Sequence, residues 1–386
     1  MTDVLASSHT RSAEDLLAAV RRHRERFEGA ARQAELERTL PADVVALLRE
    51  SRLFWLKTPV GLGGAELDPL EFCDVLEEIA YYDASAGWAA MVGNGCTGIA
   101  GGWLPDDGVA EVFGSADDPP VLAGQITPRG TAVPVPGGYT VTGRWGFCSG
   151  ILHSGWLLAG CAVEGAPGEM VVVVVPKSET TVHDNWHVAG LQGTGSCDVS
   201  VAEVFVPARR ALDWSGGARP RRGGGIYRQP VDLFVSNELA PVTVGIARRA
   251  IDDMYELAGR TARLPGGPAL SERAAFQKDI AHCECRLRAA RLLYRDAVER
   301  VWAATTGGEP LGAADVAAVR AQHTHVVEEC VDVVVKIIRY AGGRALALSH
   351  PLQRHLRNLT AAAQHAYISD ELYEIAGKAR LAERNR

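Results

Sequence analysis

One histidine near the C-terminal end of the chain, His365, carries a side chain that can hold or release a proton near neutral pH. On a predicted helix it shares one face with Arg354, Asn358 and Ala361, which precede it at helical spacings. Such a half-polar face fits a residue that donates or accepts a proton in a reaction. A lone helical histidine also fits a buried packing position, so the spacing leaves both roles open.

A second group of aromatic and polar side chains, residues 145–150, follows a predicted strand and includes Trp145, Phe147 and Ser149. Small residues at a strand end let the backbone approach a planar ligand, and the Ser149 hydroxyl can donate or accept a hydrogen bond at a ring nitrogen. The later segment Gly193–Ser196 could offer backbone N–H groups to an anion or to the edge of a cofactor. Alone, each segment is more typical of a tight turn.

The start of a predicted helix in the C-terminal half pairs a basic and an aromatic side chain, Arg273 and Phe276, on one face. The Arg273 guanidinium could bind a phosphate while the Phe276 ring packs on a flat cofactor, although a surface arginine beside a core phenylalanine fits equally. Further along, Gly342 and Gly343 end a helix and free the backbone for close contact. The sequence shows no metal-ligand spacing, so no metal site is predicted.

The composition of the chain excludes several classes of function. A formal net charge of −7 leaves no basic excess to hold a phosphate backbone, so nucleic acid is not an expected partner. Neither a GxGxxG segment after a strand nor a Walker-type phosphate loop occurs. No apolar run reaches the roughly 18 residues of a membrane span, and no signal peptide is recognisable. With eight scattered cysteines that fit reduced thiols, we expect a cytoplasmic protein without membrane contact.

Three regions of different pattern must position these side chains. Residues 1–118 show helical spacing, and Asp68–Glu71 carries a helix-start signal with an aspartate cap, a proline in the first turn and a capping-box glutamate. Residues 119–214 change to short β-branched runs with turns. Residues 226–386 return to long helical blocks, the last near 350–378, as in a four-helix bundle. This order argues against a doubly wound α/β fold.

Taken together, the order and spacing of these segments resemble the acyl-CoA dehydrogenase superfamily over residues 15–378. The resemblance implies a mostly helical α+β fold with an N-terminal helical domain, a central β-barrel or β-sandwich domain and a C-terminal four-helix bundle. It implies that the Arg273–Phe276 segment contacts the phosphate and ring of a flavin. It also implies that Gly342–Gly343 reaches the same cofactor from a neighbouring subunit, so a homotetramer is expected.

The C-terminal segment distinguishes two branches of this superfamily. It lacks the glutamate base and the Gly-Thr signature of true acyl-CoA dehydrogenases. The sequence is instead similar to the two-component (group D) flavin-dependent monooxygenases of this fold, which include phenol-type and steroid-ring hydroxylases, thiophene S-oxygenases and amino-sugar N-oxygenases. The resemblance rests on residues 145–150, Gly193–Ser196 and Gln364–His365.

This resemblance implies a monooxygenase that hydroxylates a small aromatic or polycyclic natural-product intermediate. Reduced flavin, FADH2 or FMNH2, would come from a separate NAD(P)H-dependent flavin reductase and react with O2 through a C4a-hydroperoxide, which an apolar pocket must shield from water. Ser149 would act near the flavin N5 atom, with Trp145 and Phe147 as further cofactor contacts. His365 would face the substrate as the second catalytic residue.

The expected substrate pocket departs from the family pattern at one place. Many relatives with phenolic substrates carry a histidine after the segment Gly87–Trp88, whereas residues 92–97 contain none. The polar residues in that region, Asn94 and Cys96, are therefore the candidate substrate contacts beside His365. Three alternatives stay open: an acyl-CoA dehydrogenase-type FAD enzyme, an amino-group N-oxygenase of the same fold, and an inactive binding or assembly protein.

Overall fold

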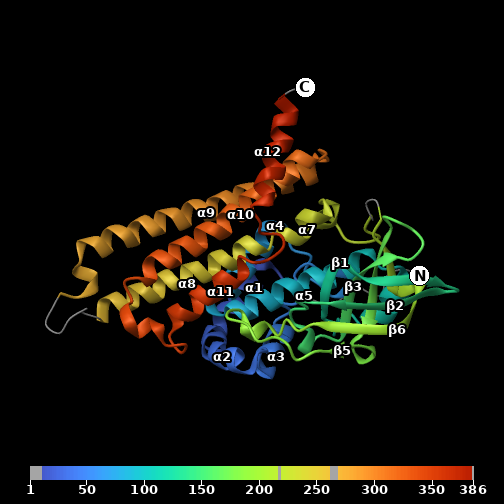
Figure 1. Cartoon of the computed structure of the whole chain (residues 1–386), viewed down its shortest axis with the longest axis horizontal. Helices are drawn as coiled ribbons and strands as arrows, with labels where there is room; N and C mark the ends of the chain where they lie inside the picture. Colours follow the sequence, from blue (N-terminus) through green and yellow to red (C-terminus); the bar gives the residue numbers. More distant parts are fainter. Residues whose placement is uncertain (1–10, 216–218, 261–267, 385–386) are drawn as a thin grey trace.

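The computed structural model describes residues 11–215, 219–260 and 268–384. Its elements follow the predicted order of helices, sheet and helical bundle, which confirms the mostly helical α+β fold (Figure 1). The N-terminal helices are α1 (Ala13–Arg22), α2 (Arg24–Glu37), α3 (Ala42–Glu50), α4 (Pro69–Tyr82), α5 (Ala84–Trp103) and α6 (Asp106–Phe113). Helix α4 begins as predicted, because the Asp68 carboxylate accepts hydrogen bonds from the Leu70 and Glu71 N–H groups and the Glu71 carboxylate accepts one from Asp68 N–H.

Helix α5 runs through the centre of the molecule, between the sheet and the bundle (Figure 1). Every residue of α5 except Val92 is buried. Its glycines make this packing possible: an added Cβ would lie 3.0 Å from the Phe54 ring at Gly93 and 3.1 Å from the Phe234 ring at Gly98. The glycine-rich sequence therefore lets α5 be packed on all sides and hold its side chains in fixed positions.

The central domain is a single seven-stranded sheet. Its strands are β1 (Leu122–Val135), β2 (Gly138–Trp145), β3 (Trp156–Val163), β4 (Met170–Pro176), β5 (Thr181–Val182), β6 (Val199–Pro207) and β7 (Ala211–Asp213). They lie in the order β5-β6-β2-β1-β3-β4-β7; β1 and β3 are parallel and the other neighbours antiparallel. Leu122 and Leu158 on one face pack with Trp103 and Phe113 of α5 and α6. The opposite face buries its own core around Trp145.

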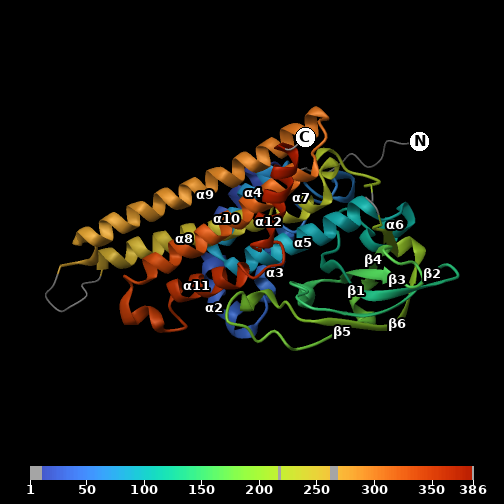
Figure 2. The same cartoon turned by 45° about the horizontal axis from the view of Figure 1, so that its top comes forward.

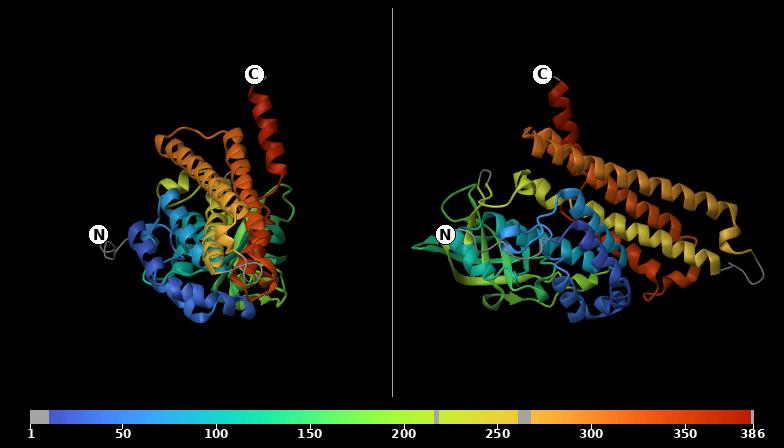
Figure 3. Two further views of the ribbon diagram at one scale, coloured as in Figure 1. Left: turned by 90° about the vertical axis from the view of Figure 1, so that its left-hand side faces the viewer. Right: turned by 180° about the vertical axis from the view of Figure 1, so that it is seen from behind.

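The C-terminal region packs four helices side by side (Figure 2). Its elements are α7 (Val231–Ser236), α8 (Leu239–Arg260), α9 (Ala274–Gly307), α10 (Ala313–Ile338), α11 (Pro351–Ala362) and α12 (Glu371–Arg384), with α8 to α11 forming the bundle. Helix α12 packs on α10 near its start, where Leu372 is buried, and its C-terminal part projects away from the body of the molecule (Figure 3). Among the described residues, no helix has both the length and the apolar character needed to cross a membrane.

The last predicted helix, 350–378, is wrong in its extent. The chain leaves the helical path after Ala362, and α12 begins only at Glu371. Ile368 is buried and holds the connecting turn, while the Ser369 hydroxyl accepts a hydrogen bond from the Glu371 N–H group at the start of α12. His365 therefore lies in a turn between two helices and not on a helical face.

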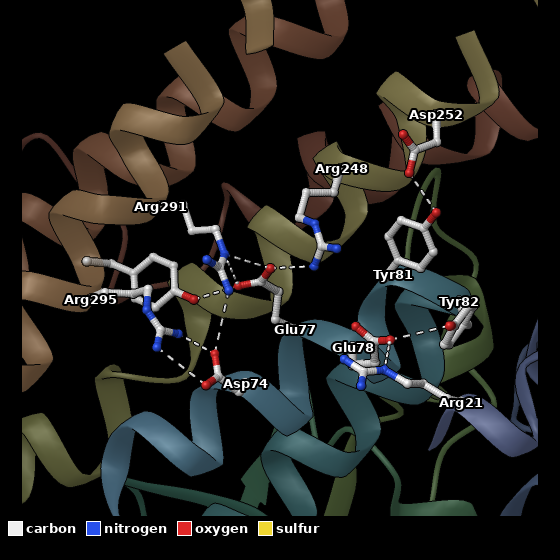
Figure 4. A network of polar contacts seen from close by, with 11 residues as sticks. Arg21, Asp74, Glu77, Glu78, Tyr81, Tyr82, Arg248, Asp252, Arg291 and Arg295 are labelled. Carbon is white, nitrogen blue, oxygen red and sulfur yellow. Dashed lines mark hydrogen bonds and ion pairs between the residues drawn. The ribbon is translucent and has the colours of Figure 1, made fainter. Parts of the chain in front are cut away.

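A buried carboxylate joins the N-terminal helices to the bundle (Figure 4). Glu77 of α4 is 1% exposed and accepts hydrogen bonds from Arg248 of α8 and from Arg291 and Tyr294 of α9. The neighbouring Glu78 pairs with Arg21, whose side chain is 60% exposed. Because the first group is buried, removal of its carboxylate would cost far more stability than removal of the exposed pair's carboxylate.

Candidate active site

The loop after β2 holds a phenylalanine in an uncommon and exposed position. Phe147 has a φ angle of +59°, and its side chain is 76% exposed. A bulky residue seldom adopts positive φ, because its Cβ meets the backbone, so the surrounding structure must maintain it. The loop is held by backbone hydrogen bonds from Cys148 N–H to Cys197 O and from Gly150 N–H to Thr194 O. An exposed aromatic ring on a fixed loop can pack against a flat ligand.

Ser149, two residues further along this loop, is connected to two polar side chains directly and to a third through one of them. Its hydroxyl oxygen accepts a hydrogen bond from Trp88 Nε1 at 3.2 Å and lies 2.6 Å from Ser196 Oγ. Ser196 Oγ in turn lies 2.7 Å from Thr194 Oγ1. The two segments that seemed separate in the sequence, residues 145–150 and Gly193–Ser196, thus form one site.

His365 reaches the same site from the C-terminal side. Its ring centroid is 5.7 Å from that of Trp88 and 5.5 Å from that of Tyr367. Burial lowers the pKa of His365 to about 4, so the imidazole is neutral at pH 7. The Nδ1 atom accepts a hydrogen bond from Tyr367 N–H at 3.2 Å, which assigns the proton of the neutral ring to Nε2. His365 therefore offers a hydrogen-bond donor.

Trp88 is the residue that connects these parts, and sequence reasoning missed it as a site residue. Its indole contacts Ser149 through Nε1 and His365 through its ring. A tryptophan one turn into a buried glycine-rich helix is typical of a core position. Only its neighbours in space, which come from the loop after β2 and from the turn after α11, indicate that Trp88 belongs to a site.

Three predicted site residues lie buried within the protein. The Trp145 side chain is fully buried and donates to Gly160 O in the sheet core, so it cannot contact a cofactor. Asn94 uses both amide hydrogens and accepts two backbone N–H groups within the protein, so it has no capacity left for a substrate. Cys96 is buried against Gly124 O of β1, and burial raises the pKa of its thiol.

The remaining predicted cofactor residues lie at the other end of the molecule. Arg273 precedes α9, and Gly342 and Gly343 begin the short 3₁₀ segment between α10 and α11. Both segments lie at the end of the long axis that is opposite the sheet (Figures 1 and 3). Phe276 is buried beneath Tyr340, with ring centroids 5.3 Å apart. One chain therefore does not bring these residues to Phe147 and Ser149.

A large cavity is present elsewhere. It has a volume of about 620 Å³ and is lined by aromatic, proline and polar residues that include Trp103, Trp214 and Tyr227. Trp103 ends α5, whereas Trp88 lies near its beginning, so the two places are roughly 22 Å apart along the helix. No predicted site residue lines this cavity.

A planar cofactor fits the Phe147 and Ser149 surface by its chemistry. Phe147 offers an exposed apolar ring, and Ser149, two residues later in the same loop, offers a buried hydroxyl oxygen. Burial is the cause of the lowered pKa of the nearby His365. These residues suit an uncharged ring system with a polar edge, such as the isoalloxazine of a flavin.

Comparisons with known proteins cover nearly the whole chain. The family models described as "Acyl-CoA dehydrogenase, N-terminal domain" and "Acyl-CoA dehydrogenase, C-terminal domain" match residues 10–101 and 238–370. An indole-3-acetate monooxygenase of Pseudomonas putida is 31% identical over 347 residues, which cover 88% of this chain and 87% of that protein. The oxygenase subunit HsaA of a flavin-dependent monooxygenase from Rhodococcus jostii is 28% identical, with 87% and 90% covered.

Solved structures agree with this similarity. XiaF from Streptomyces, in complex with FADH2 and glycerol, matches with a TM-score of 0.89 and 26% identity over 96% of both chains. A 3-HSA hydroxylase from Rhodococcus matches with a TM-score of 0.88 and 26% identity over 95% of this chain and 97% of that chain. The first of these structures contains the reduced form of a flavin.

Proposed function

Because the chain belongs to the two-component flavin-dependent monooxygenases of the acyl-CoA dehydrogenase fold, as the oxygenase component, we propose that it hydroxylates a small aromatic or polycyclic molecule beside Trp88 and His365. An oxygenase component of this kind implies a separate flavin reductase as partner. The observation that supports the proposal is the contact of Trp88 with both Ser149 and His365, in which one indole meets a hydroxyl and a neutral imidazole.

The surroundings of His365 favour an aromatic substrate. Trp88 and Tyr367 present aromatic rings within 6 Å centroid distance of the imidazole, at 5.7 and 5.5 Å. Aromatic rings at this spacing attract a further ring through edge and offset contacts. Relatives point to the same class: they include an indole-3-acetate monooxygenase and a resorcinol hydroxylase.

Ser149, Trp88 and His365 have different roles in the proposed reaction. When bound, reduced flavin supplies the electrons with which one atom of O2 is transferred. Ser149 holds the cofactor edge, and the buried Trp88 keeps water from that edge. His365 donates a hydrogen bond from Nε2 to an oxygen atom of the reactants, since Nδ1 is already an acceptor for Tyr367 N–H. His365 therefore acts as a hydrogen-bond donor and not as a proton acceptor.

We further propose that each flavin site is shared between two copies of the chain in a homotetramer. Arg273 and the Gly342–Gly343 segment lie at the end of the long axis that is opposite Phe147, so only a second copy can bring both groups to one cofactor (Figure 1). Apolar side chains are exposed at this end and on α12, where they suit subunit contacts. They include Leu346, Leu348, Ile375 and Leu381.

Replacing Arg273 by alanine is expected to weaken binding of reduced flavin about ten- to hundredfold, because hydrogen bonds to a charged group contribute roughly 1.5–3 kcal/mol. Binding is measured by anaerobic titration, with sedimentation velocity to check that the oligomer persists. Arg288→Ala, an exposed arginine on the same helix α9, serves as the control and is expected to bind normally. Normal binding by Arg273→Ala, or a monomeric wild-type protein, would overturn the shared site.

The proposed reaction is tested by supplying enzymatically reduced flavin, ¹⁸O₂ and a panel of phenols, indoles and polycyclic aromatic compounds. We expect one compound to gain a single ¹⁸O atom on a ring carbon, as seen by mass spectrometry and NMR. Amines and sulfides in the same panel serve as competitors. A label found only on nitrogen or sulfur would contradict aromatic hydroxylation, as would consumption of O2 with hydrogen peroxide as the sole product across the panel.

A further inference from the structure

Three hydroxyl groups in the candidate active site form an unbroken chain. Thr194 Oγ1 lies 2.7 Å from Leu191 O, Ser196 Oγ lies 2.7 Å from Thr194 Oγ1, and Ser149 Oγ lies 2.6 Å from Ser196 Oγ. All three hydroxyl side chains are at most 4% exposed. Two oxygen atoms this close, away from water, need one hydrogen between them, since their lone pairs otherwise repel.

The positions of the three hydrogens follow by elimination. Leu191 O is a carbonyl and can only accept, so the hydrogen in the first contact belongs to Thr194. Thr194 then accepts from Ser196, because a hydroxyl has a single hydrogen. Ser196 is likewise committed and accepts from Ser149. The carbonyl at the end of the chain therefore sets the direction of every hydrogen bond in it.

Ser149 is left as a pure acceptor toward the ligand. Its hydrogen points to Ser196, and one of its lone pairs receives the Trp88 Nε1 hydrogen, which an indole can only donate. A single lone pair remains free. The hydroxyl beside the candidate cofactor surface can therefore receive a hydrogen bond but cannot give one.

We propose that Thr194 and Ser196 act as positioning residues that make the site selective for reduced over oxidised flavin. The proposal rests on the proposed placement of the flavin N5 atom at Ser149. Reduced flavin carries a hydrogen on N5 and can donate a hydrogen bond to the free lone pair of Ser149. N5 of oxidised flavin is itself an acceptor, so its lone pair would be repelled by that of Ser149. The selectivity originates in the Leu191 carbonyl, three side chains from the cofactor.

This selectivity suits an enzyme that takes its flavin from a separate reductase. The oxygenase must capture reduced flavin from solution and release oxidised flavin after each turnover. A hydroxyl that could rotate and donate would bind both redox states. A Ser149 hydroxyl whose hydrogen is fixed toward Ser196 disfavours oxidised flavin, so oxidised flavin no longer competes for the site. No charged side chain is needed for this effect.

The test measures the dissociation constants of wild-type and variant proteins for oxidised flavin and, under anaerobic conditions, for reduced flavin, with FMN and with FAD. Ser196→Ala frees the Ser149 hydrogen, and Thr194→Val lets Ser196 donate to Ser149 instead. In both variants, the dissociation constant for oxidised flavin divided by that for reduced flavin is expected to fall about tenfold. That change equals a shift of about 30 mV in the two-electron potential of the bound flavin.

Controls separate this effect from a general disturbance. Thr194→Ser keeps the hydroxyl and is expected to keep the wild-type ratio. Ser154→Ala removes a buried hydroxyl of the same loop region that donates to Gly150 O and takes no part in the row of three hydroxyl groups. This variant is also expected to keep the wild-type ratio of dissociation constants. An unchanged ratio in Ser196→Ala and Thr194→Val, with both proteins folded, would overturn the proposal.

Ser149→Ala distinguishes the selectivity from the placement of the flavin. We expect it to weaken binding of reduced flavin and to abolish the preference between redox states. If Ser149→Ala binds both states like wild type, N5 does not lie at Ser149 and the placement itself fails. If Ser149→Ala loses reduced flavin while Ser196→Ala and Thr194→Val keep the wild-type ratio, the placement stands and only the role of the hydroxyl chain is refuted.

Discussion

Product formation is expected to fall about a hundredfold when His365 is replaced by alanine, with little change in the affinity for reduced flavin. Loss of one fixed hydrogen-bond donor to reacting oxygen typically slows a reaction by about 10²–10³. His365 is such a donor because Tyr367 N–H occupies Nδ1 and burial keeps the ring neutral. The measurement is product formed per reduced flavin in single-turnover mixing with O2 and substrate.

Glutamine at position 365 tests the donor role directly, because its amide can still donate. We expect His365→Gln to recover a substantial part of the lost product. His325→Ala, an exposed histidine on α10, is the control and should behave like wild type. Equal loss in the alanine and glutamine variants would argue for proton transfer, and normal product in His365→Ala would remove this residue from the mechanism.

The pH dependence of product formation follows from the lowered pKa of His365. The pKa of His365 is lowered to about 4, below its ordinary value of 6.5. The neutral ring, whose Nδ1 accepts from Tyr367 N–H, is therefore fully present at neutral pH and is lost only as the pH falls through about 4. His365 is expected to add no pH dependence to product formation above about pH 5.

Replacing Glu77 by alanine is expected to destabilise the protein by about 3–5 kcal/mol, the cost of breaking a buried charge network on one side. The Arg248 and Arg291 guanidinium groups and the Tyr294 hydroxyl would lose their shared acceptor between α4, α8 and α9 (Figure 4). Denaturation midpoints in guanidinium chloride, followed by fluorescence and circular dichroism, measure the change.

The adjacent residue provides a matched control on the same helix. Glu78→Ala removes an ion pair with Arg21, which is 60% exposed, and is expected to cost less than about 1 kcal/mol. Glu77→Gln keeps the size of the side chain and separates the loss of charge from the creation of a cavity. Similar midpoints for Glu77→Ala and Glu78→Ala would contradict the role of Glu77 in joining the N-terminal helices to the bundle.

Local signals in the sequence predicted the elements well. The start of α4 at Asp68 depends on hydrogen bonds within four residues, so it could be read from the chain directly. The end of α11 could not, because the buried Ile368 and the Ser369 hydroxyl, and not a glycine or proline, shape the turn. His365 was consequently assigned to a helical face that the chain does not form.

The candidate site depends on contacts between distant segments, which explains what sequence reasoning missed. Trp145 and Asn94 are residue types that could bind a ligand. In the structure, however, Trp145 is buried in the sheet core, and Asn94 makes all its hydrogen bonds to the backbone around α5. Trp88 has the pattern of a core residue and gains its proposed role only beside Ser149 and His365. The proposed contact of Arg273 with the cofactor requires a second copy of the chain, which no pattern in the sequence could position.

The most direct test of the proposed site is a crystal structure of the protein grown without oxygen in the presence of reduced flavin. We predict that N5 lies within hydrogen-bonding distance of Ser149 Oγ, that the ring packs on Phe147, and that Arg273 of a neighbouring copy contacts the phosphate. Flavin bound instead in the cavity lined by Trp103 and Trp214, or held within a single chain, would contradict the proposed site.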